Sequence, residues 1–199
     1  MGIRKIIQFF ALGLLLIVLP VGSLLYLRSG YFERYNALQE LKDYGKLPDF
    51  QLQTPNGGLN NQQLRGRYVV LGKMETFDES HPIIDQSKKL FTQFGDSKEI
   101  AICTYVRDMD SLAVALFLDK MIQDTASHWY FLSGEPVFKK LFEEYEPNYL
   151  ALIDTSSVIR HFYNADKDTE VGEMAKHVAM FVAPLKRSGE LIYEREKEK

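Results

Sequence analysis

Four polar side chains suited to metal binding or acid–base chemistry lie close together in one short stretch. Glu75, Asp78, Glu79 and His81 follow an apolar, strand-like run and precede Pro82, where a helical pattern begins. Carboxylates and imidazole bind divalent cations, so the stretch is a candidate metal site. Acidic residues beside a helix N-terminus are also expected without any ligand, because the helix dipole and the unpaired backbone N–H groups favour them. No recognised ligand spacing is present, so we expect a solvated loop, with Asp78, Glu79 and His81 as the only candidate ligands.

The protein contains a single cysteine, Cys103. Thiol–disulfide exchange requires an accessible thiolate and usually a second, resolving cysteine. Cys103 lies within the apolar, β-branched run 100–106, where a free cysteine behaves as a small hydrophobic residue. We therefore expect a buried structural thiol, with an intermolecular disulfide or a sensor thiol as the alternative.

Other kinds of functional site have little support in the sequence. His128, His161 and His177 fall on separate predicted elements, with His161 at a position that could face solvent, and no pattern gathers them with a carboxylate and a serine. Phosphate loops and dinucleotide fingerprints are absent. Trp129 and its aromatic neighbours favour core packing over a binding platform. A net charge of −3 without a basic stripe gives no reason to expect nucleic acid as a partner.

The N-terminal region has the composition of a membrane anchor. Residues 1–5 form a short basic tail, and residues 6–27 form an apolar run. A helix needs about 20 apolar residues to cross the hydrocarbon core, so this run predicts a transmembrane segment. A cleaved signal peptide is the alternative, with residues 20–23 as a candidate cleavage region. The apolar run continues beyond that region and exceeds the usual signal-peptide core of about 7–15 residues.

The charges around this run do not settle its direction, because basic residues lie on both sides. A short tail before the run and a large domain after it are typical of a signal-anchor. This arrangement predicts a single-pass protein of the cell membrane with an extracytoplasmic, periplasmic domain. Helical spacing predicts a juxtamembrane helix or stalk over residues 28–46, ending at Gly45. The globular domain is expected over residues 47–184, followed by a charged tail over residues 185–199.

Hydrophobic patterns within the domain predict an ordered series of elements. They are a strand in 47–53, a turn at 54–58, a helical turn capped by Asn60 or Asn61, a strand at 68–74, a helix from Pro82 to Gly95, a strand at 100–106, a helix from Asp110 or Ser111 to Ile122, a strand at 128–132, a helix at 135–145, a hairpin of 149–154 and 158–163, and a last helix with Val171 to Val182 on its inward face. This order predicts an α/β, thioredoxin-like fold with a mixed sheet, helices on both faces and the hairpin as an antiparallel edge.

Several of these segments resemble the SCO/SenC family, the membrane-tethered thioredoxin-fold proteins of cytochrome oxidase assembly. The matching pieces are Leu-Pro-Asp-Phe-Gln-Leu at 47–52, Leu-Arg-Gly-Arg-Tyr-Val-Val-Leu at 64–71, Val-Arg-Asp-Met-Asp-Ser at 106–111, His-Trp-Tyr-Phe-Leu-Ser-Gly at 128–134, and the hairpin containing Leu-Ile-Asp at 152–154. The resemblance spans residues 47–184 and lies more in the order of the pieces than in any single piece.

The sequence departs from that family at its functional residues. Family members carry two cysteines three residues apart after the first core strand, which serve in copper ligation and thiol exchange. The corresponding loop, Phe77–Ile83, contains no cysteine. The family's third copper ligand is a histidine shortly before the closing hairpin, and residues 145–149 contain no histidine. Copper is therefore implied by the resemblance alone, and none of its family ligands is present.

These observations predict a non-catalytic, SCO-like protein that acts by protein–protein contact. The resemblance implies an accessory or assembly role around respiratory cytochrome oxidase or in redox homeostasis, with a membrane or periplasmic protein as partner and no cofactor. The alternative is a divergent copper chaperone or thiol-disulfide oxidoreductase that uses Cys103 or the Asp78, Glu79 and His81 loop. A third possibility is a structural membrane protein whose stalk dimerises.

Overall fold

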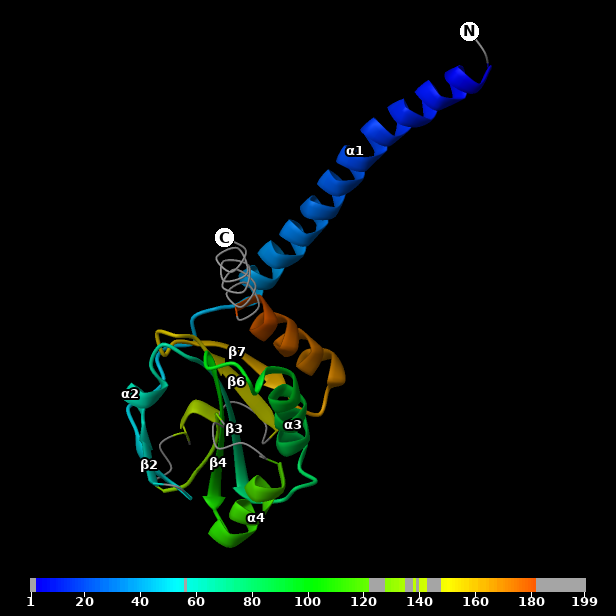
Figure 1. Ribbon diagram of the computed structural model, residues 1–199. Helices are drawn as coiled ribbons and strands as arrows, with labels where there is room; N and C mark the ends of the chain where they lie inside the picture. Colours follow the sequence, from blue (N-terminus) through cyan, green and yellow to red (C-terminus); the bar gives the residue numbers. More distant parts are fainter. Residues whose placement is uncertain are drawn as a thin grey trace, which may run out of the picture. The chain divides into compact units, whose positions relative to one another are not determined.

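The computed structural model describes residues 3–55, 57–121, 128–134, 138, 140–142 and 148–181. The chain divides into two units, Met1–Glu40 and Leu41–Lys199. The first unit is one helix, α1 (Ile3–Glu40) (Figure 1). By length and apolar composition this helix can cross a membrane, a property that N-terminal signal sequences share.

The stalk differs from the expectation of a separate helix that ends at Gly45. Helix α1 continues without a break through residues 28–40 and ends at Glu40. The next residues are extended along strand β7 (Ile159–Asn164), where the backbone N–H groups of Lys42 and Tyr44 donate to the carbonyls of Arg160 and Ile159, each at 3.0 Å. These bonds cover part of an exposed strand edge, which is why the chain leaves the helix before Gly45. The compact second unit accordingly begins at Leu41, earlier than the boundary expected at residue 47.

The second unit is built on a five-stranded mixed sheet with the order β5-β4-β3-β6-β7. Its other strands are β3 (Tyr68–Thr76), β4 (Ile100–Asp108), β5 (Trp129–Leu132) and β6 (Tyr149–Ile153). Strands β3, β4 and β5 are parallel, while β6 is antiparallel to both β3 and β7. The predicted thioredoxin-like arrangement, with a closing antiparallel hairpin, is confirmed.

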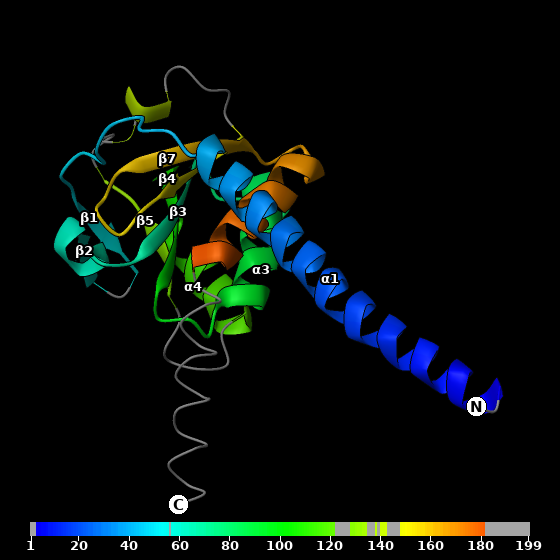
Figure 2. The same cartoon turned by 90° about the horizontal axis from the view of Figure 1, so that it is seen from above.

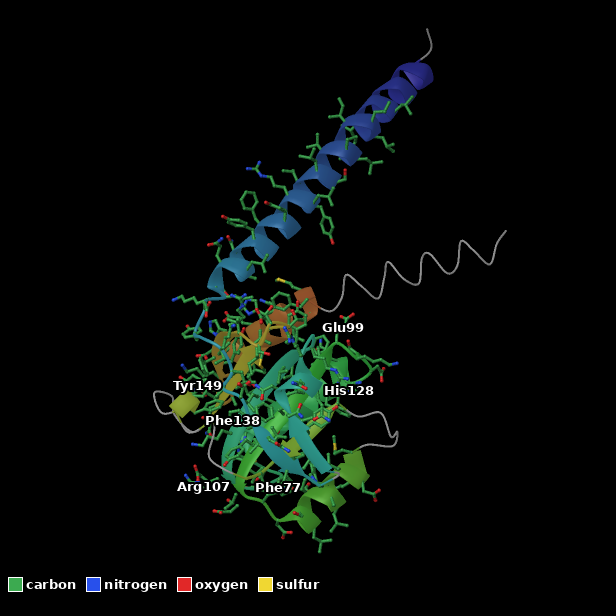
Figure 3. The ribbon with its side chains drawn as sticks, turned by 90° about the vertical axis from the view of Figure 1, so that its left-hand side faces the viewer. Phe77, Glu99, Arg107, His128, Phe138 and Tyr149 are labelled. Carbon is green, nitrogen blue, oxygen red and sulfur yellow. The ribbon has the colours of Figure 1, made fainter. Side chains whose placement is uncertain are left out.

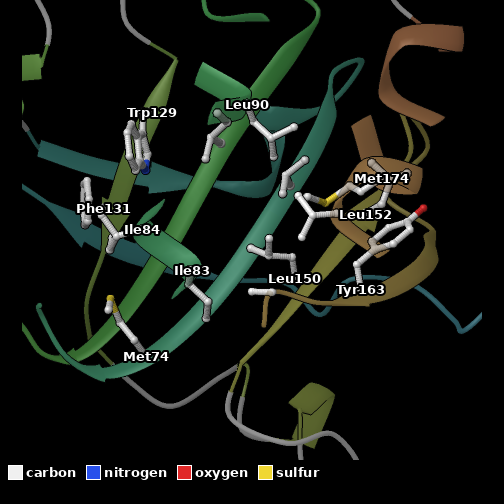
Figure 4. Packing of buried hydrophobic residues seen from close by; sticks show 14 of the residues in the cluster. Met74, Ile83, Ile84, Leu90, Trp129, Phe131, Leu150, Leu152, Tyr163 and Met174 are labelled. Atoms are coloured by element: carbon white, nitrogen blue, oxygen red, sulfur yellow. The ribbon is translucent and has the colours of Figure 1, made fainter. Parts of the chain in front are cut away.

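Helices cover the two faces of the sheet unequally. Helices α3 (Pro82–Phe94), α4 (Ser111–Met121) and a last helix over residues 168–181 contribute to one core cluster, part of which is drawn in Figure 4. Chain order explains this, because β3, β4 and β5 succeed one another in the same direction across the sheet. Two right-handed crossovers taken in one direction place both connecting helices on the same face.

The opposite face packs against short elements. A hairpin of β1 (Gln51–Thr54) and β2 (Gly57–Asn60) leads into α2 (Asn61–Leu64), and a 3-10 turn, η1 (Lys140–Phe142), lies later in the chain. Leu52, Leu59, Leu64, Phe138 and Phe142 from this region are buried in a second cluster. Figure 2 shows the hairpin and α2 on the side of the sheet away from α3.

Most predicted elements are present close to their expected positions. Asn60 caps α2 through a capping box with Gln63, and the carboxylate of Asp110 accepts from the backbone N–H groups of Leu112 and Ala113 at the start of α4. Strand β2 was not expected, because its two glycines have low strand propensity and only pairing with β1 supports it. Most of the helix expected at 135–145, together with Ile122 and Val182, lies outside the described residues.

Gly72 permits the close packing of α3 on β3. A Cβ atom at this position would lie 2.5 Å from Cγ2 of Ile83 and 3.0 Å from Cδ2 of Leu150. Both neighbours are fully buried, so neither has space to move away. The first turn of α3 therefore sits against β3 only because residue 72 lacks a side chain.

We expect Gly72→Ala to destabilise the second unit by about 1–3 kcal/mol through overpacking. Urea unfolding of the full chain in detergent, followed by the fluorescence of the single tryptophan, Trp129, measures this loss. Combining Gly72→Ala with Ile83→Ala should cost less than the sum of the two single changes, because the clash is removed. Gly58→Ala is the matched control, since its Cβ would meet only the carbonyl oxygen of Leu52 at 3.9 Å. Additive losses would contradict the packing explanation.

Candidate functional site

The candidate site lies where the parallel strands end. Strand β3 ends at Thr76 and leads through residues 77–81 into α3, while β4 ends at Asp108 just before α4. Strand β6 begins and β7 ends at this same end, as their pairing with β3 requires. In Figure 3, Phe77 and Arg107 mark this end of the sheet, and Glu99 and His128 mark the opposite end. The loop 77–81 therefore occupies the position of a thioredoxin-type active-site loop.

Phe77 fastens the start of this loop to the core. Its ring makes edge-to-face contacts with Phe117 of α4 and Phe131 of β5, at centroid distances of 5.5 and 5.6 Å. Aromatic pairs in this arrangement contribute about 0.5–1.5 kcal/mol beyond the area that they bury. Sequence reasoning missed this role, although a lone aromatic residue within an acidic loop is a signal that such a contact exists.

Asp78 and Ser80 form a local turn. One carboxylate oxygen of Asp78 accepts from both the backbone N–H and the hydroxyl of Ser80, each at 2.8 Å. The bond from the backbone N–H, followed by that from the hydroxyl, holds the pKa of Asp78 below its usual range. The backbone N–H of His81 closes the turn by donating to the Asp78 carbonyl at 3.1 Å. This carboxylate therefore stabilises the loop in its present conformation.

His81 is the N-cap of α3. Its Nδ1 accepts from the backbone N–H of Ile83 at 3.3 Å, so the neutral ring with an unprotonated Nδ1 is the form that caps the helix. Burial lowers the pKa of His81, and the negative charges of Asp78 and Asp166 offset part of that effect. Pro82 follows at the first helical position, where its missing N–H costs nothing.

The two glutamates of the loop region form ion pairs. Glu75 contacts Arg107 of β4 at 2.6 Å and Lys73 at 3.6 Å. Glu79 lies 3.8 Å from Lys120 of α4. These side chains are about half exposed or more, apart from the more buried Lys73, so each pair contributes little by itself. Their arrangement connects the loop to β4 and α4 rather than converging on one point.

The four loop residues are thus close in sequence without forming a cluster of ligands. Over the described part of the chain, no group of three or more His, Cys, Asp or Glu side chains is placed to hold a metal ion. Asp78, Glu79 and His81 are brought to the same loop but have separate hydrogen-bond and ion-pair partners. The sequence predicted their position, and only the structure reveals these partners.

Cys103 lies far from solvent, in the middle of the sheet. Its side chain is only 1% exposed and packs in the second core cluster, and along the strands it pairs with Leu71 and Tyr130. Burial raises the pKa of the Cys103 thiol far above its usual range, and the positive charge of Arg67 offsets little of this. The thiolate needed for exchange or metal ligation is strongly disfavoured in this environment.

Two histidine environments were not foreseen. Tyr163 and His177 are buried and share a hydrogen bond of 2.7 Å between the phenol oxygen and Nδ1, and His161 stacks on Tyr163 at a centroid distance of 4.4 Å. His161 is therefore partly buried, not a free surface residue. Nothing in the sequence spacing links a strand tyrosine to a histidine in the last helix. This group joins β7 to the last helix.

At the opposite end of the sheet, His128 lies 3.3 Å from a guanidinium nitrogen of Arg67, measured to Nδ1. Burial lowers the pKa of His128, as do the positive charges of Arg67 and Lys98. Trp129 and Phe131 on the adjoining strand are buried, which confirms core packing over a binding platform.

The folded-state pKa of His81 lies below the unfolded value of about 6.5, which gives a defined pH dependence. The stabilisation from its neutral ring is complete above about pH 6.5 and is lost as the pH falls toward the folded pKa. Carboxylates with a lowered pKa, such as Asp78, change the stability with pH only in a more acidic range, at about pH 4 and below.

We therefore expect the Tm of the full chain to fall between about pH 7.5 and about pH 5.5. His81→Asn should show a smaller fall, because asparagine caps helices without titrating in this range. Thermal unfolding at the two pH values measures both changes, with Ser80→Ala as a control that retains His81. The pKa of His128 is also lowered in the folded state, so the Tm of His81→Asn should still fall as the pH decreases, but by less than that of the wild type. An unchanged slope in His81→Asn would contradict the capping role.

Comparison with solved structures places this fold among SCO-type and thiol-exchange proteins. A SCO1/SenC family lipoprotein from Bacillus anthracis str. Ames matches with a TM-score of 0.58 at 17% identity, covering 72% of this chain and 98% of that chain. BsSco, a member of the Sco family of cytochrome c oxidase assembly proteins, matches with a TM-score of 0.57 at 15% identity, covering 70% and 95%. A thiol-disulfide oxidoreductase from Bacteroides fragilis NCTC 9343 matches with a TM-score of 0.51 at 16% identity, covering 66% and 98%.

No protein-family model and no curated protein matches the sequence. At these identities the structural likeness concerns the fold. The second unit is similar to nearly the whole length of SCO1/SenC structures, so the resemblance seen in the sequence is confirmed at the level of the fold. The chain therefore has a thioredoxin-like, SCO-type fold.

Proposed function

We propose that this chain is a membrane-anchored, extracytoplasmic SCO-like protein that acts by protein–protein contact rather than by catalysis. Its expected setting is respiratory cytochrome oxidase assembly or redox homeostasis, to which the SCO-type fold points. The observation that carries the proposal is the state of the loop 77–81. Asp78 and Ser80 hold a turn, His81 caps a helix and Phe77 packs in the core, so this loop supplies structure where related folds supply thiols.

The buried thiol supports the same conclusion. Cys103 is separated from the loop by the segment Gly72–Thr76 of β3, since it pairs with Leu71 in mid-sheet while the loop begins after Thr76. A redox or copper-transfer role for Cys103 would require the sheet to open. An interaction role requires only a stable surface held near a membrane partner, where anchoring raises the effective concentration.

Helix α1 supports membrane anchoring through its composition along the axis. At the end of the apolar run and just beyond it, Tyr26, Tyr31, Phe32 and Tyr35 are exposed, and Tyr31 stacks on Tyr35 at 6.3 Å between ring centroids. Exposed aromatic residues at one end of an apolar helix are typical of the membrane–water interface. The hydroxyl of Ser23 donates to the carbonyl of Pro20 at 2.9 Å, which satisfies a polar group inside the apolar run.

The thiol and copper test uses the full chain in lipid nanodiscs. We expect a maleimide to leave native Cys103 unmodified over a period in which it fully modifies the urea-unfolded chain, because the thiol is buried and protonated. Ser156→Cys, on an exposed hairpin turn, is the positive control for labelling of the native state. Cu(I) titration should show no stoichiometric binding. Rapid native labelling, or one tightly bound copper per chain, would replace this proposal with a divergent copper chaperone or oxidoreductase.

The anchoring test is independent of the first. We expect the chain to remain in the membrane fraction after alkaline carbonate extraction, and its mass to include residues 1–27, because the apolar run exceeds a signal-peptide core. Protease added to spheroplasts should digest the second unit if it lies outside the cytoplasm, with an inner cytoplasmic protein as the protected control. Release of a chain that lacks its first residues would identify a cleaved signal peptide.

A further inference from the structure

Helix α4 carries an exposed apolar face beside the candidate site. Leu112 and Leu116 are 70% and 63% exposed, and Ala115 lies between them on the same side of the helix. Val114 and Phe117, on the other side, are buried in the core, so burial of the helix leaves these leucines uncovered. Residues four apart lie one above the other on a helix, which makes Leu112, Ala115 and Leu116 a continuous strip. We call these three residues the α4 face.

This exposure contrasts with the rest of the second unit. Among its described residues, the only other exposed large hydrophobic side chain is Tyr44, at 42%, and its ring packs against Phe162. A polar face would be expected on a helix whose opposite side is fully buried. Contiguous exposed apolar surface on a soluble domain commonly marks an interaction site.

The surroundings of the α4 face are acidic. Asp108 and Asp110 precede the helix, and Asp119 follows Leu116 by one helical turn on the same side. All three carboxylates are exposed, and none forms an ion pair with a basic side chain among the described residues. Of the nearby cations, Arg107 pairs with Glu75 and Lys120 with Glu79, while Lys88 lies over the ring of Phe117 and donates to the backbone carbonyl of Glu79. The α4 face is thus an apolar strip with unpaired negative charge at both ends.

The charge around the α4 face argues against a lipid surface as its occupant. The anionic lipids of a membrane would be repelled by the three exposed aspartates Asp108, Asp110 and Asp119.

A second copy of this chain is disfavoured on the same grounds of charge. A symmetric dimer through the α4 face would bring the same aspartates of both copies together. A partner with an apolar strip flanked by lysine or arginine would instead cover the leucines and pair with the free carboxylates. A helix with apolar residues at intervals of three and four satisfies both requirements, since it matches the spacing of Leu112, Ala115 and Leu116.

We infer that the α4 face is a docking site for a basic amphipathic helix of a partner protein. This inference rests on the contact role proposed above and specifies the chemistry of the partner. The ion pair between Lys120 and Glu79 places the docking site directly beside the loop 77–81. The partner would therefore contact the end of the domain at which thioredoxin-like proteins meet their substrates, although no thiol is present in that loop.

The test uses the full chain in phosphatidylcholine nanodiscs and a fluorescein-labelled, helix-forming peptide of leucine and lysine, read by fluorescence anisotropy against empty nanodiscs. We expect saturable binding that weakens as salt increases, because exposed charges are screened. Leu112→Gln and Leu116→Gln should each weaken binding about tenfold, as expected for loss of one buried leucine. A peptide in which glutamate replaces lysine should not bind.

Two further variants distinguish specific docking from nonspecific binding of the peptide. Asp108→Asn with Asp119→Asn should weaken binding and reduce its salt dependence, while leaving Asp110 to cap the helix. Asp96→Asn, an exposed acidic position at the far end of α3, should leave binding unchanged.

Equal binding by the wild type and the leucine variants, no binding beyond empty nanodiscs, or equal binding of the glutamate peptide would overturn the inference. Self-association abolished by Leu116→Gln, without peptide binding, would assign the face to a second copy instead. None of these outcomes depends on thiol or copper chemistry, so this inference can fail while the proposed function stands.

Discussion

The close approach of α3 to β3 at Gly72 sets the geometry on which the candidate site depends. Ile83 and Ile84 of the first helical turn are fully buried, and Ile83 occupies the space that a side chain at position 72 would fill. The helix therefore begins immediately beside the end of β3, and only the few residues 77–81 can bridge the gap. A connection this short has few conformations available, so each of its side chains has a defined structural role.

The residues of that connection form hydrogen bonds at the place where thiol chemistry would need a free reactive group. A catalytic loop needs its reactive atom at the helix N-terminus, exposed and stabilised as an anion. Here the helix N-terminus is capped by a neutral imidazole, and the neighbouring carboxylate is held by Ser80. The electrostatic conditions of the fold are retained, since a helix dipole still points at the loop. They stabilise a turn and a cap in this chain.

On the second unit, exposed apolar and acidic side chains lie together outside this loop, at helix α4. Residues 42–47 cover the beginning of the β7 edge, and the opposite sheet face is covered by the β1–β2 hairpin. Helix α4 has no such cover among the described elements, and its Leu112 and Leu116 remain exposed between aspartates that form no ion pair. A domain whose cysteine is buried and whose β7 edge is partly covered thus keeps the apolar and charged α4 face exposed.

The sequence by itself determined the order of the elements, and through them the thioredoxin-like topology and the place of the loop. Periodicity and capping residues are local properties, so β3, α3, β4 and the closing hairpin could be predicted from Tyr68–Val106 and residues 149–163 without knowledge of contacts. It also determined that the loop lacks cysteine. The burial of Cys103 followed from its apolar neighbours, and the structure agrees.

Only the tertiary structure decided how the polar residues are used. The hydrogen bond between Tyr163 and His177, the ion pair between Arg107 and Glu75, and the contacts of Phe77 join residues that are far apart in the chain. The end of α1 at Glu40 was likewise not evident from the sequence, because the residues that follow it pair with β7, which lies far along the chain. Side chains at short sequence spacing suggested a metal site at residues 75–81. Their distinct partners in space explain why the same residues form a turn, a cap and three ion pairs.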